Sequence, residues 1–299
     1  MILEGSRRLA SGDLEAVFLP RHGMLGASLR HRGVELLRRV DDLEVSAAKG
    51  STAGIPLLYP WANRLEGPRY RAAGKDVVLD MKSPLLHADE RGLPIHGVPW
   101  SRLPWEVVEA RSDRLATRLE WRRPDWLSVF PFPHRLEMSV SIFSSALEIA
   151  TVLVAGAEGP VPVSFGFHPY VGIAGVPRGD WILELPGMRR LVLNEQRIPT
   201  GEEEPFPSRD SPLDDRVFDD GFALEGDGAA LAISGSGRRI AMELLEGYRY
   251  AQVYAPRGAD FVALEPMTAP ANALVSGRGL TVIEPGKRFR AAFRIRVES

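Results

Sequence analysis

Strict alternation of apolar and polar residues in the middle of the chain is the feature that most constrains its fold. Apolar side chains occupy every second position from 136 to 142, and an apolar run resumes over 147–154 after a turn at 144–146. A period of two places successive side chains on opposite faces of a strand. The pattern therefore predicts a long antiparallel hairpin with one solvated face.

The same short-strand pattern recurs along the rest of the chain. We predict hairpins over 28–37, turning at 31–33, and over 69–79, turning at 73–75. Further strand-like runs lie at 115–121, 181–185, 190–193, 229–233, 239–244, 251–254 and 289–297. The 29 glycines and 24 prolines break these runs at close spacing, and no window shows a helical stripe, although 40–48 fits either a short helix or irregular structure. The chain is therefore predicted to be all-β, a large antiparallel β-sandwich.

Nothing in the sequence divides the chain into separate units. A repeat of fixed period is absent, which disfavours a propeller. The segment 199–215 is polar and reads as a long loop rather than a linker, because strand-like runs continue on both sides. Large β-sandwiches reach this length as one domain, so we expect a single domain over residues 1–299.

Composition and charge narrow the class of ligand. The formal net charge is -2, which gives no electrostatic attraction for nucleic acid or an anionic membrane, so neither is expected as a partner. The absence of cysteine excludes disulfides, thiolate nucleophiles and cysteine-ligated metals. No signal-peptide core or apolar stretch of membrane-spanning length is evident, so we expect a cytoplasmic protein that binds a small molecule.

Glu265 is the first candidate for chemistry. It follows the apolar run 261–264, and Pro266 and Pro270 are expected to stop that strand. A carboxylate at a strand end beside the core can serve as a base, although such a residue is more often a solvated edge residue.

Other candidate side chains lie in similar settings. His96 precedes a glycine and His168 precedes a proline, each after apolar residues, where a strand-breaking neighbour favours a side chain directed into a concave region. A structural role is the common alternative for a single histidine. Asn63 and Arg64 follow a proline-rich aromatic run, and the pair at 219–220 consists of two aspartates that could simply close a turn.

Motifs for metal and cofactor chemistry are missing. The sequence has no His-x-His or His-x-x-x-His pair, no Gly-x-Ser-x-Gly elbow and no glycine-rich loop between a strand and a helix. We therefore expect neither a metal nor a cofactor. The class of chemistry that remains is acid-base catalysis without a cofactor.

Five segments occur in an order that resembles the aldose 1-epimerase (galactose mutarotase) family. They are Pro-Trp-Ala-Asn-Arg at 60–64, His-Gly at 96–97, Gly-Phe-His-Pro-Tyr at 166–170, Asp-Asp-Gly-Phe at 219–222 and Leu-Glu-Pro-Met-Thr at 264–268. The resemblance covers most of the chain. It implies the large β-sandwich of that family, with a sugar cleft on one sheet.

The resemblance also implies a role for individual residues. Glu265 would be the general base and His168 the general acid. The implied sugar ligands are His96, Arg64 and Asp219, and the residues implied to line the cleft are Asn63, Trp61 and Tyr170. The family's aspartate motif commonly differs at 220, so Asp220 is the alternative to Asp219 as the sugar contact.

The implied activity is an isomerase that interconverts the α and β anomers of a free aldohexose such as glucose or galactose. The C1 hydroxyl loses its proton while the ring oxygen gains one, the ring opens, and it closes again on the other face of C1. A carboxylate and an imidazole on opposite sides of the C1–O5 unit suffice for this. Ordinary pKa values of the two groups would give a narrow optimum on the acid side, unless a neighbouring carboxylate raises the pKa of the imidazole.

Two rival functions stay open. A relative acting on hexose 6-phosphates would hold its phosphate on Arg71, Arg91 or Arg189, but the Asn63-Arg64 pair favours a neutral sugar. A non-catalytic sugar-binding protein would be expected to have lost the acid or the base. In either case the partner is a small-molecule sugar, and the chain is expected to be a monomer or a homodimer.

Overall fold

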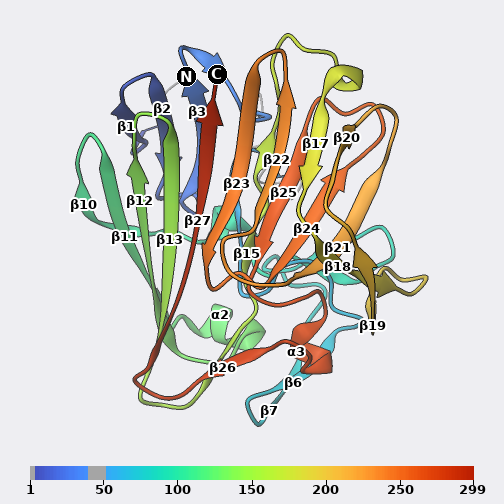
Figure 1. The fold of residues 1–299 in the computed structure, drawn as a ribbon. Coiled ribbons are helices and arrows are strands. Elements are labelled where there is room, and N and C mark those ends of the chain that lie inside the picture. The colour runs from blue at the N-terminus through green and yellow to red at the C-terminus, as the bar shows by residue number, and fades with distance from the viewer. Residues whose placement is uncertain (1–3, 40–51) are drawn as a thin grey trace.

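The computed structural model describes residues 4–39 and 52–299, and two large antiparallel sheets make up most of it (Figure 1). The larger sheet has nine strands. In spatial order they are β10 (Glu106–Ala110), β11 (Arg114–Trp121), β12 (His134–Ile142), β13 (Ala146–Ala155), β27 (Arg288–Glu298), β23 (Arg238–Glu246), β22 (Ala230–Gly235), β17 (Ile182–Leu185) and β20 (Arg209–Pro212). Figure 1 shows β27, in red, between the green β13 and the orange β23.

The second large sheet has eight strands and carries the candidate site. Its path is β19 (Pro199–Phe206), β18 (Met188–Leu193), β21 (Phe218–Leu224), β24 (Tyr250–Ala255), β25 (Val262–Met267), β15 (Gly166–Phe167) and β5 (Leu57–Leu58), with β16 (Tyr170–Val171) also paired to β25.

Smaller elements surround these sheets. A four-stranded sheet contains β1 (Arg7–Ser11), β2 (Leu14–Leu19), β3 (Leu25–His31) and β4 (Val34–Glu35). Two-stranded sheets pair β6 (Arg69–Ala72) with β7 (Lys75–Val78), β8 (His87–Ala88) with β9 (Pro94–Ile95), and β14 (Val161–Val163) with β26 (Thr281–Ile283). In the part of the chain that the structure describes, the helices are α2 (Pro124–Val129), α3 (Ala273–Ser276) and the 3₁₀ turns η1 (Trp100–Arg102) and η2 (Arg178–Asp180). None of the helices in the described ranges is long and apolar enough to cross a membrane.

The core lies between the two large sheets and determines which face of the eight-stranded sheet stays open. Phe167 of β15 packs against Phe293 of β27, with ring centroids 5.0 Å apart, and both rings are buried. Phe165 packs on Phe289 of β27 in the same way. Because side chains alternate along a strand, His168 is directed to the face opposite Phe167, away from the nine-stranded sheet.

The predicted fold class and hairpins are confirmed. The all-β prediction agrees with the two antiparallel sheets, and the alternation near residue 140 corresponds to the hairpin of β12 and β13. The hairpins over 28–37 and 69–79 are present as β3–β4 and β6–β7. The hairpin of β6 and β7 turns at Ala73 (φ 44°) and Gly74 (φ 79°). A tight hairpin turn of this kind needs two positive φ angles.

Two local predictions were wrong, and a third is outside the described structure. The segment 199–215 is not a long loop, because β19 and β20 form within it and pair with β18 and β17. Pro266 does not end the strand before it: β25 runs through Glu265 to Met267. On this side β25 pairs with β15 at Met267 and with β16 at Val262 and Ala263, so the break in pairing includes Pro266 and its missing N–H interrupts no ladder pair. The segment 40–48 lies outside the described residues.

Candidate active site

The register of four neighbouring strands explains how the site forms. Gly166 pairs with Met267 and Tyr170 pairs with Ala263, a register that places His168 opposite Glu265. Glu265 in turn pairs with Gln252 on its other side. The three polar side chains therefore form one row across β25 and its neighbours.

A second row lies two residues along the same face. Tyr170, Ala263, Tyr254 and Asp219 follow one another across β16, β25, β24 and β21. Small residues occupy one position in each row, Ala263 here and Gly221 next to Gln252. They leave room above the sheet for a ligand between larger polar side chains.

The acid-base pair lies at the base of this region. His168 Nε2 is 3.1 Å from Glu265 Oε1, and the two side chains are 7% and 2% exposed. Glu265 Oε2 is buried without a hydrogen-bond partner among the described residues, so it is free to accept a hydrogen bond from a ligand. Notably, the two groups touch each other. They do not stand on opposite sides of a ligand as the sequence analysis expected.

Burial controls the ionisation of both groups. Burial raises the pKa of Glu265 well above its usual range, the nearby Asp219 raises it further, and Arg64 partly offsets this. Burial also lowers the pKa of His168 to about 3, with a smaller contribution from Arg38. A neighbouring carboxylate therefore does not raise the His168 pKa here, because loss of hydration is the largest effect on the imidazole. Both shifts favour the neutral forms, which share one proton between Oε1 and Nε2.

Tyr170 packs directly on the imidazole. The rings of His168 and Tyr170 stack with centroids 4.2 Å apart, and the Tyr170 hydroxyl is 3.4 Å from His168 Nε2. The same hydroxyl hydrogen-bonds to Thr52. These contacts hold the ring plane of His168 fixed against the sheet.

His96 and Asn63 come from two loops that are bonded to each other. The backbone N–H of His96 donates to the carbonyl of Asn63 at 3.0 Å, and the N–H of Asn63 donates to His96 Nδ1 at 3.2 Å. Both residues have φ near +60°, a strained conformation that is common at functional sites. Position 97 requires glycine, because a Cβ there would lie 2.3 Å from the Tyr59 carbonyl oxygen.

This arrangement fixes the tautomer of His96. Burial lowers its pKa well below the usual range, and the nearby His168 and Arg64 lower it further, so the ring is neutral. Since Nδ1 accepts a hydrogen bond from Asn63, the ring proton must be on Nε2. His96 is therefore a hydrogen-bond donor through Nε2. Its ring lies edge-on to His168, with centroids 5.8 Å apart.

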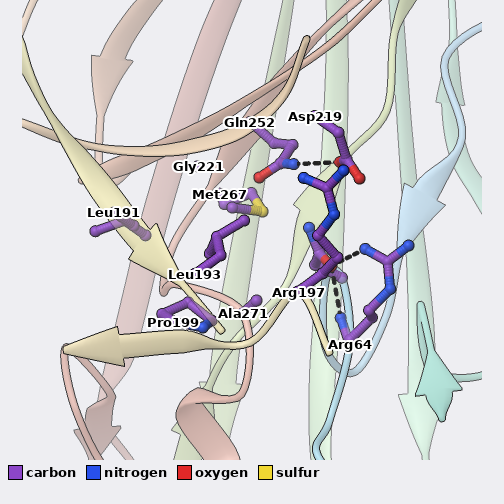
Figure 2. Close-up of a pocket in the computed structure, with 11 residues that line it drawn as sticks. Arg64, Leu191, Leu193, Arg197, Pro199, Asp219, Gly221, Gln252, Met267 and Ala271 are labelled. Carbon is purple, nitrogen blue, oxygen red and sulfur yellow. Dashed lines mark hydrogen bonds between the residues drawn. The ribbon is translucent and has the colours of Figure 1, made fainter. Parts of the chain in front are cut away.

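Arg64 and Asp219 provide the charged part of the wall. Arg64 Nε donates to Asp89 Oδ2 at 2.7 Å, and Asp219 Oδ1 accepts a hydrogen bond from Gln252 Nε2 at 2.8 Å. Figure 2 shows Asp219 and Gln252 bonded to each other on one side and Arg64 on the other. Asp220 is next along β21, so its side chain points to the opposite face, 3.9 Å from Arg190.

These residues enclose one open cavity of about 210 Å³. Pockets for drug-sized ligands are roughly 300–1,000 Å³, so this cavity suits a smaller molecule. Its lining residues are Asn63, Arg64, Ile95, His96, His168, Tyr170, Asp219, Gln252, Tyr254 and Glu265. A narrow recess continues from it past Arg197 and Leu193, and the two share Asn63, Arg64, Asp219 and Gln252 (Figure 2).

The structure therefore brings together seven of the eight candidates. The exception is Trp61, which is 1% exposed, packs near Tyr70 and is absent from the cavity wall. Trp61 was predicted to line the cleft, but its large apolar ring is buried in the core instead. In the described ranges, no three His, Asp or Glu side chains are grouped as a metal site would require.

Among the polar residues in and beside the cavity, sequence reasoning missed Gln252, Tyr254 and Asp89. Gln252 and Tyr254 occupy alternate positions of the predicted strand 251–254, so a polar residue between apolar neighbours was the available signal for Gln252. Asp89 has no comparable signal, since it lies in a polar loop remote from Arg64 in sequence.

The fold and this cavity define a β-sandwich protein with a buried carboxylate–imidazole pair facing a small polar ligand site. The family model for aldose 1-epimerase matches residues 9–296, and the chain belongs to that family.

The individual relatives share little sequence with this chain. The chain is 24% identical over 247 residues to the uncharacterized protein YihR of Escherichia coli K12, a match that covers 80% of this chain and 77% of YihR. A galactose mutarotase-like protein from Clostridium acetobutylicum superposes with a TM-score of 0.85 at 18% identity, covering 98% of this chain and 94% of the other. An aldose epimerase homologue from C. elegans gives a TM-score of 0.80 at 16% identity, covering 98% of both chains. At these identities the superpositions support the fold alone.

Proposed function

We propose that the protein is a cofactor-independent aldose 1-epimerase that interconverts the α and β anomers of a free aldohexose. The observation that carries the proposal is the buried contact of 3.1 Å between His168 Nε2 and Glu265 Oε1 at the base of a small polar cavity. A base and an acid side by side can serve both O1 and O5 of a pyranose, because these two oxygens are bonded to the same carbon.

Ring opening uses the ion-pair form of the couple. Glu265 takes the proton from the C1 hydroxyl, the C1–O5 bond breaks, and His168 gives its proton to O5. The products are the open-chain aldehyde, a protonated Glu265 and a neutral His168. Rotation about C1–C2 and the reverse transfers close the ring on the other face of C1.

The other wall residues have binding roles in this proposal. His96 donates a hydrogen bond through Nε2, while Arg64 and Asp219 hold sugar hydroxyls through charge-assisted hydrogen bonds. Asn63 and Tyr170 complete the wall, and Asp219 rather than Asp220 is the sugar contact, because only Asp219 lines the cavity.

A neutral sugar is favoured over a phosphorylated one. The three arginines considered for phosphate do not line the cavity, and each pairs with an acidic neighbour: Arg71 with Asp76, Arg91 with Glu90 and Arg189 with Glu203. A purely sugar-binding role is disfavoured because both members of the acid-base couple are in contact.

Polarimetry of freshly dissolved α-D-glucose and α-D-galactose tests the proposal. The wild-type protein should accelerate the decay of optical rotation over the buffer rate. Glu265→Gln should lower the enzymatic rate by a factor on the order of 10² to 10⁴, the usual contribution of a positioned acid or base. The matched control is Glu202→Gln, because Glu202 is an exposed carboxylate on β19. This variant should not change the rate. Near-full activity of a folded Glu265→Gln variant would show that the base lies elsewhere.

A further inference from the structure

The two carboxylate oxygens of Asp89 make different kinds of contact. Oδ1 accepts the backbone N–H groups of Arg91 and Leu93, both at 2.9 Å, and so closes the loop between β8 and β9. Oδ2 accepts Nε–H of Arg64 at 2.7 Å. One side chain therefore joins a tight turn to an arginine of the cavity wall.

The loop that carries Asp89 is fixed to the segment that carries Arg64. The N–H of Leu65 donates to the carbonyl of Pro94 at 2.9 Å, and Arg64 forms a bridge with Ile95. The N–H of His96 donates to the carbonyl of Asn63 in the same ladder. Asp89 and Arg64 consequently face each other from two backbones that are held in register.

The contact between Asp89 and Arg64 is shielded from solvent. The Asp89 side chain is 2% exposed and that of Arg64 is 11% exposed. Burial works against ionisation of Asp89, but the hydrogen bonds from Arg64 and the loop N–H groups outweigh it, so the Asp89 pKa is lowered. An ionised pair of this kind is little screened by salt and strongly directional.

Because Arg64 Nε is bonded to Asp89, the Nη1 and Nη2 end of the guanidinium is left for a ligand. Nη1 makes a long contact of 3.3 Å to Asn63 Oδ1, and Nη2 has no hydrogen-bond partner within the described residues. Without Asp89, the Arg64 side chain would have several rotamers available and would lose entropy on binding a sugar.

We propose that Asp89 is a positioning residue of the sugar site, which holds Arg64 in the orientation that binds substrate hydroxyls. The inference rests on the proposed function for its ligand. Asp89 itself does not line the cavity and is not a catalytic residue.

Asp89→Asn isolates this role from the role in the loop. The amide oxygen of asparagine can still accept the N–H groups of Arg91 and Leu93, whereas its NH₂ group would face the Nε–H donor of Arg64. Asp80→Asn is the matched control, because Asp80 caps a nearby exposed turn through the N–H of Lys82 and contacts no arginine in the described structure.

A double-mutant cycle in mutarotation kinetics tests whether Asp89 acts through Arg64. Asp89→Asn should raise KM about tenfold with a smaller change in kcat, and Asp80→Asn should change neither. In the Arg64→Ala background, Asp89→Asn should have little further effect on kcat/KM, since the residue it orients is gone. Additive losses in kcat/KM would overturn the proposal.

A second readout does not depend on activity. The Nε–H proton of Arg64, assigned by its disappearance in Arg64→Lys, should give a low-field, slowly exchanging NMR signal in the wild-type protein. The signal should move and exchange rapidly in Asp89→Asn and stay unchanged in Asp80→Asn. An unchanged signal in Asp89→Asn overturns the positioning role. Absence of activity toward every aldose, with the expected NMR change, refutes the proposed function and leaves the orientation of Arg64 supported.

Discussion

The pH dependence of kcat/KM provides a quantitative test of the acid-base couple. The reactive enzyme has one proton shared between His168 and Glu265. The couple gains a second proton only below the imidazole pKa, which burial lowers to about 3. It loses its single proton only above the carboxyl pKa, which burial raises well above its usual range. The active window should therefore open near pH 3 and extend beyond the ordinary carboxyl value.

This window differs from the one that unperturbed groups would give. Ordinary values of ~4.3 for Glu and ~6.5 for His would confine activity to a window of about two pH units. With the imidazole pKa lowered to about 3, the acid limb should lie more than one pH unit below the ordinary carboxyl value of ~4.3. The fraction of the couple in the ion-pair form is constant across the plateau, so it lowers the rate without changing the pH dependence.

Initial rates by polarimetry, measured after brief pH jumps with the buffer rate subtracted, give this profile. Circular dichroism at each pH checks that the protein stays folded. His168→Gln should abolish the acid limb, and any residual activity of Glu265→Gln should lack the alkaline limb. A narrow bell with limbs near pH 4.3 and 6.5 in the wild-type protein would refute the argument that burial controls both groups.

Three further predictions concern binding and stability. Asp219→Asn should weaken sugar binding by roughly 10- to 100-fold, the range for a hydrogen bond to a charged group, while Asp220→Asn should have little effect. Calorimetric titration compares the two variants. The reverse order of effects would move the sugar contact to Asp220. Arg197→Ala should raise KM for neutral sugars by less than about tenfold, and a selective loss of the rate on glucose 6-phosphate would instead support a phosphorylated substrate. His134 has a pKa lowered by burial to about 3, so only the unfolded state takes up this proton between pH 6.5 and 3. Stability is then present above pH 6.5 and should fall on acidification by on the order of 5 kcal/mol from this residue. Denaturant titrations at several pH values measure the fall, and a pH-independent free energy of unfolding over this range would contradict it.

Much of the fold could be predicted because periodicity reports local geometry. The alternation before residue 142 and the positive-φ turn at 73–74 each specify a hairpin without reference to the rest of the chain. Pro266 was misread for the opposite reason. Whether a proline ends a strand depends on the pairing beside it, and the break in pairing between β25 and its neighbours β15 and β16 is a tertiary feature.

In the candidate site, too, local sequence patterns could be read and tertiary contacts could not. His168 and Glu265 stood out because each adjoins a proline after an apolar run, and the sheet register then places them opposite each other. Trp61 belongs to the same motif as Arg64 but packs into the core, because sequence proximity does not determine which way a side chain points. Asp89 acts across a contact between two loops, which no local pattern reports.

The position of β27 has a consequence for how the chain is made. This strand, residues 288–298, pairs with β13 on one side and β23 on the other, so the two halves of the nine-stranded sheet meet only through it. During synthesis on the ribosome, both neighbours are made before their shared partner. Each then has an unpaired edge, the kind of surface that invites aggregation. The nascent chain must therefore keep two strand edges apart from other chains until β27 has left the tunnel and paired with both, and we expect chaperone dependence to end only at that point.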